Sequence, residues 1–509
     1  MPDCGTVYLV GAGPGDVGLL TLRGAELLRR ADVVVYDALV NPDLLRLAPK
    51  SAEIIYGGKR AKAHAIPQED LNQLLVAKAK LGKCVVRLKG GDPYVFGRGG
   101  EEAEELADAS VPFEVVPGIS SIIAAGNYAG IPITHRDHCS SFTVFTGHED
   151  PNKVTSNLDW SRLAQDSGTK VVLMGAERIR QIAAQLVAHG ADKKMPVAMI
   201  RWGTTGRQRV IEGTLGNIAD IADKAKFGAP AVTLIGGVVG LRKKLNWFER
   251  RPLFGKRVVV TRTREQASQL SVRLAELGAD VLEIPTIKIA PPQDKVALVE
   301  SIVGLGEYDW LVFTSPNGVT AFFDYYFKVK DDLRDLGQLR FAAVGPATAA
   351  KIKELHLHVD AMPEKYVAKA VAKAIDETES VENLRLLLLR AEVSTPELPK
   401  QLEEMGAIVD DVAVYQTVPE TEDITGAATR FEEEGAAWIT FASSSAVENF
   451  NARFDLSKCL KKFPKMKLLS IGPETSKAIL ELGCKSAIES RPHNIDGMVS
   501  ALLKSVARR

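Results

Sequence analysis

The sequence predicts an α/β protein of several domains, and three observations support this fold class. The chain has 509 residues, whereas a single hydrophobic core rarely grows beyond about 250–300 residues. Short β-branched runs alternate with helical patterns through the N-terminal half, which is typical of α/β folds. The C-terminal half contains an internal repeat, which predicts two similar doubly wound α/β units with a cleft between them.

The N-terminal half is expected to form two α/β subdomains, at about residues 1–117 and 140–246. Pro117-Gly118 and the 130–132 segment interrupt the pattern between them, and such residues mark turns. The predicted strands are residues 7–10, 33–36, 85–88, 113–116, 142–145, 171–174, 197–200 and 232–235.

The main domain boundary is expected in the basic segment LRKKLNWFERRP, residues 241–252. We expect Trp247 and Phe248 to dock on a neighbouring surface, and the hinge to lie within residues 250–255. The predicted domains are therefore 1–248 and 255–509, with a linker at 249–254.

The repeat in the C-terminal half consists of three matched blocks in the same order. VVVTRTREQASQLSVRLAELGADV begins at Val258, and LLLLRAEVSTPELPKQLEEMGAIV begins 128 residues later. WLVFTSPNGV at Trp310 is followed by WITFASSSAV at the same spacing, and VGPATA at Val344 by IGPETS 127 residues later. Each copy is expected to fold as strand, helix, strand, helix, strand, Gly-Pro turn and helix.

Composition and charge exclude several classes of protein. The chain is 46% apolar and 25% charged with zero formal net charge, so we expect a soluble globular protein without a nucleic-acid partner. No apolar run reaches the roughly 18–20 residues of a membrane helix, and no signal-peptide pattern is apparent. The five cysteines are scattered without a CxxC pair. We therefore expect a cytoplasmic protein without a membrane partner, a disulfide framework or a zinc cage.

The first glycine loop, VYLVGAGPGD at residues 7–16, resembles a dinucleotide-binding fingerprint but departs from it. Asp16 stands where GxGxxG requires glycine, and its charge would oppose a pyrophosphate. Pro14 also lacks a main-chain donor that phosphate binding uses. The simpler interpretation is a tight strand-to-helix turn, and an NAD-dependent oxidoreductase is kept only as a rival.

The segment RLKGGDPYVFGRGG, residues 87–100, is the most informative part of the chain. Its dense glycines allow the backbone to approach a ligand closely or to take positive φ. Arg87, Lys89 and Arg98 suit a ligand with several carboxylates. The segment therefore predicts a bulky cofactor held by main chain and a polyanionic substrate nearby.

Asp37 and Lys59 are candidates for proton transfer. Asp37 follows a predicted strand, at the edge where α/β sites lie, and Lys59 lies in the glycine-marked loop YGGKRAKAH. They could exchange protons if their pKa values are tuned, although spacing alone favours solvated surface charges. His135, Asp137, His138 and Cys139 could suggest a metal site, but nothing elsewhere supplies a second ligand pair at the usual spacing, so no metal is expected.

Residues 5–248 resemble the uroporphyrinogen-III C-methyltransferases. The motifs that carry this resemblance stand in the order typical of the family: GAGPGD, VVVYDALV, GGKR, RLKGGDPYVFGRGGEE, VVPGIS, GIPITHRD, TGH, VLMG and QRVIEGTL. The resemblance implies the two-subdomain tetrapyrrole-methylase fold, S-adenosyl-L-methionine as methyl donor with S-adenosyl-L-homocysteine as its product, and uroporphyrinogen III as acceptor. Methylation at C2 and C7 would give precorrin-2. A homodimer through this half is expected by the same likeness.

The resemblance also assigns residues, with Asp37 as proton acceptor and Lys59 as proton donor. The implied cofactor positions are Pro14, Gly90, Gly91, Asp92, Val95, Ser120, Ser121, Met174, Gly203 and Ala231. The implied contacts with the carboxylates of the acceptor are Arg60, Arg87, Lys89, Arg98 and Arg136. Arg98 could instead brace Glu101 and Glu102. Lys62 departs from the family, in which glycine is frequent.

Residues 254–509 resemble uroporphyrinogen-III synthase through VFTSPNGV, VGPATA, VAVYQT and IGPETS. The resemblance implies closure of hydroxymethylbilane with inversion of ring D, and Tyr415 as the candidate acid. It implies two lobes, about 255–285 plus 419–509 and 291–407, joined by two strands near 282–290 and 408–418. The alternative is a non-catalytic binding module. The expected turn residues, which could bind carboxylates or only cap helices, are Thr314, Ser315, Thr348, Ser443, Ser444 and Thr475.

Overall fold

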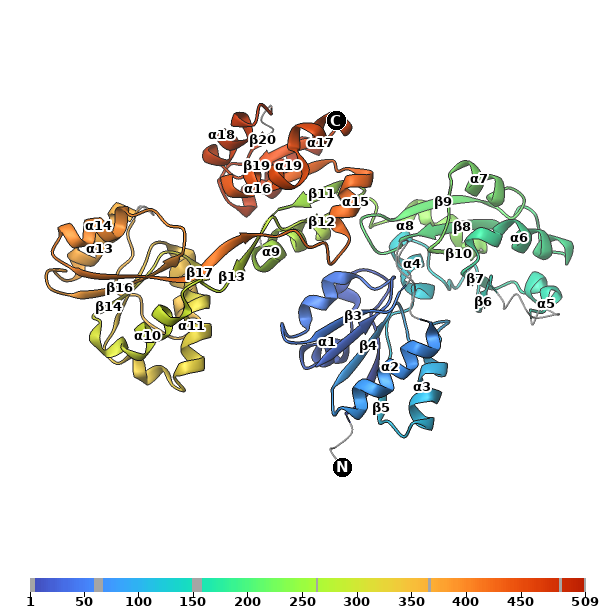
Figure 1. The fold of residues 1–509 in the computed structure, drawn as a ribbon. Coiled ribbons are helices and arrows are strands. Elements are labelled where there is room, and N and C mark those ends of the chain that lie inside the picture. Colours follow the sequence, from blue (N-terminus) through green and yellow to red (C-terminus); the bar gives the residue numbers. More distant parts are fainter. Residues whose placement is uncertain are drawn as a thin grey trace.

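A computed structural model describes residues 5–58, 67–148, 158–261, 264–364, 368–484 and 488–507. These residues form four sheets of five strands, two in each half of the chain, with helices packed against them (Figure 1). The predicted α/β fold class is confirmed.

The first sheet is fully parallel, in the order β3-β2-β4-β1-β5. Its helices α1 and η2 cover one face, and α2 and α3 cover the other. Both faces of the central strands are therefore buried, which explains their mostly apolar runs. The buried Arg87 and Lys89 of β4 are exceptions. The strands are β1 (Val7–Gly11), β2 (Val33–Tyr36), β3 (Glu53–Tyr56), β4 (Val85–Lys89) and β5 (Phe113–Val116). The helices are η1 (Val17–Leu19), α1 (Leu22–Arg29), η2 (Pro42–Leu47), α2 (Gln68–Lys80) and α3 (Gly99–Asp108).

The second sheet is mixed, in the order β6-β7-β10-β8-β9, and β10 runs antiparallel to both of its neighbours. Helices α5, α6 and α7 pack on one face, and α4 with η4 packs on the other. The strands are β6 (Phe142–Thr146), β7 (Thr169–Leu173), β8 (Pro196–Arg201), β9 (Arg209–Thr214) and β10 (Ala231–Ile235). The helices are α4 (Ser121–Ala129), α5 (Trp160–Gln165), η3 (Ala176–Arg178), α6 (Ile179–Ala188), α7 (Ile218–Lys224), η4 (Gly237–Leu241) and α8 (Arg242–Leu245).

Trp247 and Phe248 dock on the end of α4. The Tyr128 ring centroid lies 5.1 Å from that of Trp247 and 4.8 Å from that of Phe248. The Trp247 indole donates a hydrogen bond to the Asn127 carbonyl at 3.0 Å. The segment before the predicted linker is therefore packed against the N-terminal half.

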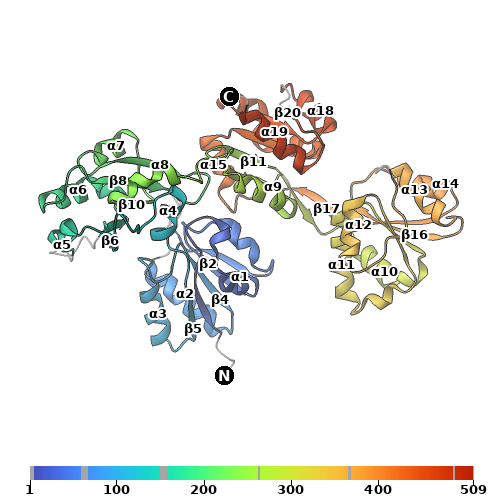
Figure 2. The same ribbon diagram turned by 180° about the vertical axis from the view of Figure 1, so that it is seen from behind.

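The C-terminal half has two lobes, each with its own sheet (Figures 1 and 2). The parallel sheet β12-β11-β18-β19-β20 defines what we call the first lobe, and β13-β17-β16-β14-β15 defines the second lobe. The first lobe contains β11 (Arg257–Val260), α9 (Arg264–Glu276), β12 (Asp280–Glu283), α15 (Ala427–Glu434), β18 (Trp438–Phe441), α16 (Ser444–Phe454), α17 (Leu456–Lys462), β19 (Lys467–Ser470), α18 (Pro473–Glu481), β20 (Ile488–Glu489) and α19 (Ile495–Ala507). The second lobe contains β13 (Ile287–Ala290), α10 (Lys295–Val303), η5 (Leu305–Glu307), β14 (Trp310–Phe313), α11 (Pro316–Val329), η6 (Leu333–Leu336), β15 (Arg340–Ala343), α12 (Pro346–Lys353), α13 (Ala368–Thr378), β16 (Arg385–Ala391), α14 (Glu397–Glu404) and β17 (Ile408–Pro419).

The two copies of the repeat exchange strands between the lobes. Trp310 of the first copy lies opposite Leu386 of the second, and Trp438 of the second copy lies opposite Val258 of the first. The pairing register is therefore the same in both lobes, with the copies interchanged. β13 pairs antiparallel with the twelve-residue β17 where the chain passes between the lobes.

Candidate active sites of the two halves

Three glycine-containing loops meet at the carboxyl ends of β1, β4 and β5. A Cβ atom added to Gly118 would lie 2.2 Å from the Gly91 carbonyl oxygen and 2.6 Å from the Gly11 Cα. The Gly91 amide donates to the Gly13 carbonyl at 2.8 Å. Backbone therefore packs directly on backbone here, and only glycine permits this approach. This edge of a parallel sheet is where ligands bind in α/β folds.

The predicted cofactor positions on these loops lie close together. A Cβ on Gly91 would lie 3.9 Å from the Ser120 Cα and 4.0 Å from the Ser121 amide nitrogen. The Asp92 carboxylate accepts hydrogen bonds from the Gly118 amide at 3.0 Å and from the Tyr94 amide at 2.9 Å. Ser120 caps α4 through the Ile122 amide. Asp92 thus ties the β4 loop to the start of α4.

The remaining predicted cofactor positions surround α4 and the second sheet. A Cβ on Gly203 would lie 3.1 Å from the Ala125 Cβ of α4. Met174 follows β7 with φ +54°. Ala231 pairs with Arg201 in the strand register, next to the Val232–Leu173 pair. Two further members of the predicted set are Val95, which packs in the core beneath α4, and Pro14, which is half-buried.

Asp16, which departs from the dinucleotide fingerprint, joins the two parts of the N-terminal half. Its carboxylate accepts from the Gly18 amide and from the Tyr128 hydroxyl, both at 2.8 Å. Its own amide donates to the Thr204 hydroxyl at 3.1 Å. Burial and then the bond to Asp16 raise the pKa of Tyr128. The Asp16 carboxylate is therefore paired with hydrogen-bond donors of the protein itself.

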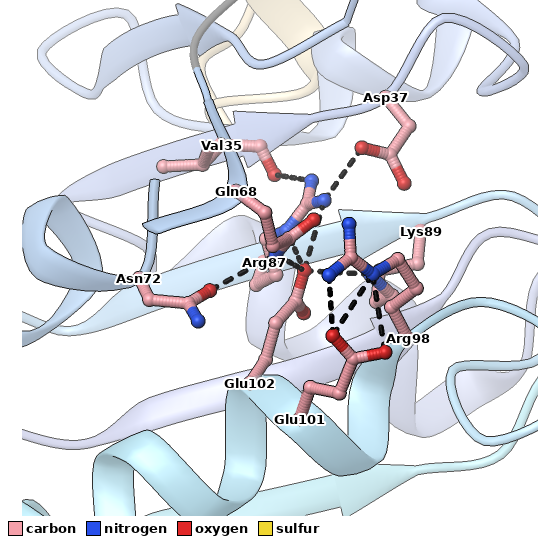
Figure 3. Close-up of polar contacts among 9 residues, drawn as sticks. All are labelled: Val35, Asp37, Gln68, Asn72, Arg87, Lys89, Arg98, Glu101 and Glu102. Carbon is pink, nitrogen blue, oxygen red and sulfur yellow. Dashed lines mark hydrogen bonds and ion pairs between the residues drawn. The ribbon is translucent and has the colours of Figure 1, made fainter. Parts of the chain in front are cut away.

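Asp37 belongs to a network of paired charges centred on Glu102 (Figure 3). Arg87 donates from Nη2 to Asp37 Oδ1 at 2.6 Å and from Nε to Glu102 Oε1 at 3.1 Å. Lys89 Nζ and Gln68 Nε2 donate to the same Glu102 oxygen at 2.7 Å and 3.1 Å. Glu102 is completely buried. Two cations thus balance two carboxylates beneath the edge that carries Asp37.

The burial of this network separates the predicted substrate contacts into two groups. Arg87 and Lys89 are only 3% and 2% exposed, so in this structure their charges are directed to Glu102 and Asp37. Burial, and then Arg87, lowers the pKa of Lys89. The second group is exposed. Arg98 pairs with Glu101, and Arg136 lies in a turn at residues 135–139.

Lys59, Arg60 and Lys62 lie outside the described residues. The substrate contacts proposed for Arg87, Lys89, Arg98 and Arg136 stay predictions. Glu102 was missed by the sequence reasoning as a functional residue, because an acidic residue in the first turn of a helix has an ordinary explanation in the helix dipole.

In the second lobe the Tyr415 hydroxyl lies 3.1 Å from the Ser315 Oγ. Ser315 also caps α11 by accepting from the Gly318 amide at 3.0 Å. Tyr415 is 8% exposed on β17, and Thr348 is buried in the first turn of α12. Half-buried Thr314 immediately precedes the cap. The structure therefore brings Tyr415 and Ser315 together at the carboxyl edge of the sheet.

The first lobe has an equivalent helix-capping serine, Ser443. Among the contacts described, Ser443 has no tyrosine partner. Ser443 caps α16 through the Ala446 amide at 3.2 Å. Ser444 donates to the Glu474 carbonyl at 3.1 Å, and Thr475 is buried in α18. Capping is thus confirmed for Ser315 and Ser443, while carboxylate binding by these turn residues stays a prediction.

No group of three histidine, cysteine, aspartate or glutamate side chains within the described residues is placed to hold a metal ion. No helix within them is both long and apolar enough to cross a membrane.

Comparison with known proteins gives each half its own match. Residues 6–219 match the family model Tetrapyrrole (Corrin/Porphyrin) Methylases, and residues 268–500 match Uroporphyrinogen-III synthase HemD. The porphyrin biosynthesis protein HemD of Ruminiclostridium josui is 38% identical over 502 residues, which cover 98% of both chains. An S-adenosyl-L-methionine-dependent uroporphyrinogen III methyltransferase of Methanosarcina barkeri is 54% identical over 237 residues, 47% of this chain and 93% of the relative.

A solved structure of uroporphyrin-III C-methyl transferase from Thermus thermophilus, complexed with S-adenyl homocysteine, is 40% identical. It covers 47% of this chain and 100% of its own, with a TM-score of 0.41. The full-length relative and the two family models together show that the chain belongs to the family of porphyrin biosynthesis proteins that join a tetrapyrrole methylase to a uroporphyrinogen-III synthase.

Proposed function

We propose that the C-terminal half converts hydroxymethylbilane into uroporphyrinogen III and that the N-terminal half methylates this product at C2 and C7, giving precorrin-2. The chain is a bifunctional enzyme of tetrapyrrole biosynthesis, as the two family matches in one chain establish. The observation that carries the methylation proposal is the meeting of three glycine loops at the sheet edge where Asp37 follows β2.

The residues at this edge fit S-adenosyl-L-methionine as the cofactor. Gly91 has φ +71°, which favours glycine, and an added Cβ would already be in van der Waals contact with the start of α4, 3.9 Å from the Ser120 Cα. The cofactor has no phosphates, so neither Pro14 nor the engaged Asp16 opposes it. Gly90, Gly91, Asp92, Ser120 and Ser121 would hold it. When bound, it supplies an electrophilic methyl group on a sulfonium.

Catalysis in the N-terminal half would then depend on positioning and on one proton for each transfer. An electron-rich pyrrole carbon gains the methyl group, and a proton must leave the substrate afterwards. We assign Asp37 as the acceptor, since Arg87 holds its carboxylate in one orientation from 2.6 Å. Glu102 and Val35 in turn fix the guanidinium. The family resemblance assigns proton donation to Lys59.

The C-terminal half requires a proton source for the hydroxyl that leaves hydroxymethylbilane during ring closure. We assign this role to Tyr415, whose hydroxyl is oriented by Ser315. Closure with ring D inverted through a spiro intermediate needs a shaped cleft more than a nucleophile. The helix N-termini that follow β14, β15, β18 and β19 offer amides for the acetate and propionate groups.

The experiment is an anaerobic incubation of the full chain with hydroxymethylbilane, with and without S-adenosyl-L-methionine. Isomer III should form without the cofactor, and the precorrin-2 chromophore should develop with it. The variant Asp37→Asn should still produce isomer III but should methylate it poorly. Formation of only the spontaneous isomer I would reject the synthase assignment in favour of a binding module. Isomer III that is never methylated would reject the methyltransferase assignment.

We also infer a homodimer through the N-terminal half and a cytoplasmic location, with precorrin-2 passing to sirohaem or cobalamin. The dimer is supported by the family resemblance and is tested by light scattering of the full chain. A monomer at micromolar concentration would reject it.

A further inference from the structure

Two segments of the N-terminal half contact the first lobe of the C-terminal half. Arg46 in η2 forms an ion pair with Glu283 at the end of β12. Gly206, which follows β8, packs on the backbone that enters β12, because an added Cβ would lie only 2.3 Å from the Ala279 carbonyl carbon. Figures 1 and 2 show the first lobe, with β11, β12 and α15, lying nearer to the N-terminal half than the second lobe does.

At this contact Arg46 lies between two carboxylates, Asp43 on its own segment at 3.0 Å and Glu283 across the contact. The Glu283 side chain is 6% exposed, and Arg46 from the other half is its ion-pair partner among the described residues. An unpaired carboxylate at such a depth would be strongly destabilising. The Arg46–Glu283 ion pair therefore favours the docked arrangement, because separation of the two halves would remove the partner of Glu283.

Arg207 extends the same contact. Its guanidinium carbon lies 4.1 Å from the centre of the Trp202 ring. Burial, and then the neighbouring Arg430 of the first lobe, lowers its pKa to about 10, whereas Asp280 and Glu434 of that lobe act in the opposite direction. The residues after β8 thus face charged groups of both signs across the contact.

The two contacting segments also hold the loop at residues 14–16 of the candidate methyl-donor site. Asn41, just before η2, donates from Nδ2 to the Gly15 carbonyl at 2.7 Å. Thr204 accepts from the Asp16 amide at 3.1 Å. A Cβ on Gly15 would lie 2.8 Å from the Thr205 Cγ2. The first lobe therefore touches both segments that flank this loop, and one of them includes the predicted cofactor position Gly203.

We propose that the first lobe stabilises the methyl-donor site. Docking of this lobe through Arg46–Glu283 and Gly206–Ala279 raises the affinity of the N-terminal half for its cofactor. This proposal rests on the cofactor positions of the proposed function. Coupling between sites is reciprocal, so bound cofactor strengthens the docking by the same factor. Such couplings typically change affinity by about 5–150-fold.

The test is a calorimetric titration of the full chain with S-adenosyl-L-homocysteine, using a charge exchange at the contact. Glu283→Arg and Arg46→Glu should each raise the dissociation constant by about 5-fold or more. The double exchange should restore it to within about twofold, because the attraction returns with reversed polarity. Asp411→Asn is the matched control. Asp411 is the repeat equivalent of Glu283 and pairs with Arg390 inside the second lobe, so cofactor affinity should not change.

A second readout follows the reciprocal effect. Addition of S-adenosyl-L-homocysteine should slow amide hydrogen exchange at residues 279–283 of the wild-type chain and not of Glu283→Arg. Unchanged affinity in both single variants would overturn the coupling while leaving the methyltransferase assignment intact. A wild-type chain that does not bind S-adenosyl-L-homocysteine at all would instead overturn the proposed methyl transfer, and this proposal with it.

Discussion

Arg87 and Asp37 form a diagonal ion pair across the adjacent strands β2 and β4. Arg87 lies opposite Val35 in the register, and its Nη2 reaches Oδ1 of Asp37, the residue just after the end of β2, at 2.6 Å. The arginine side chain is 3% exposed and the aspartate side chain 30%. A rigid buried cation thus holds a carboxylate whose outer face is open to a substrate.

The substitution Arg87→Lys should lower the kcat of methylation by about 100-fold, the loss expected when a reacting group is displaced by about 1 Å. Lysine keeps the charge but cannot hold Asp37, Val35 and Glu102 simultaneously with a planar fork. Binding of S-adenosyl-L-homocysteine should not change, because the partners described for the Arg87 side chain are Asp37, Val35 and Glu102, none of them in the glycine loops. Single-turnover methylation and calorimetry measure the two quantities. Arg180→Lys, in an exposed cluster with Asp220 and Asp223, is the control. Equal loss of rate and cofactor affinity would contradict the prediction.

The substitution Glu102→Gln should lower the free energy of unfolding by about 3–5 kcal/mol, because it leaves two buried cations with a single carboxylate, the partly exposed Asp37. The neighbouring Glu101→Gln is the matched control. Its pair with Arg98 is more than half exposed, so its loss should cost less than about 1 kcal/mol. Urea unfolding of the transition assigned to the N-terminal half measures both. Similar costs for the two substitutions would show that the buried pairs do not stabilise this half.

The lowered pKa of Lys89 predicts a pH dependence of stability. Because burial and Arg87 lower this pKa below 10.5 in the folded chain, the unfolded chain binds more protons between the folded and unfolded pKa values. Stability rises with pH wherever the unfolded state binds more protons. The free energy of unfolding of the wild type, minus that of Lys89→Met, should therefore increase across the alkaline window that ends near 10.5. Paired urea titrations measure it, and a difference that falls with pH would contradict the assignment.

The sequence predicted most strands of the N-terminal half from short runs rich in β-branched and aromatic residues, including the edge strands β5 and β6. The run at 33–36 is continuous and apolar, the run at 85–88 is interrupted only by Arg87, and both became central strands. β3 and β9 were not predicted. Both are edge strands with exposed residues, so neither a continuous apolar run nor a clean alternation marks them.

The repeat predicted two similar units, but its spacing does not determine which copy pairs with which. The 128-residue offset is the same whether each copy pairs with itself or with the other copy. The observed exchange of strands between the copies was expected only from the family resemblance. In the same way, Glu102 and Arg46 find their partners 15 and 237 residues away. Such pairs are fixed by how the sheets and lobes pack, and no local pattern records this.

The substitution Tyr415→Phe should slow formation of uroporphyrinogen III by about 10²–10⁴-fold, the usual contribution of a positioned general acid. The ring remains to fill its place in the core, so only the hydroxyl beside Ser315 is lost. The slowed enzymatic formation of isomer III then competes with spontaneous closure to isomer I. The ratio of the two isomers after incubation with hydroxymethylbilane therefore measures the loss of synthase activity. Tyr308→Phe is the matched control, since its hydroxyl bonds Asp410 near the amino-terminal end of β14, at the opposite edge of the same sheet. An unchanged isomer ratio in Tyr415→Phe would assign proton donation to another group, and an equal loss in Tyr308→Phe would indicate that the lobe as a whole is damaged.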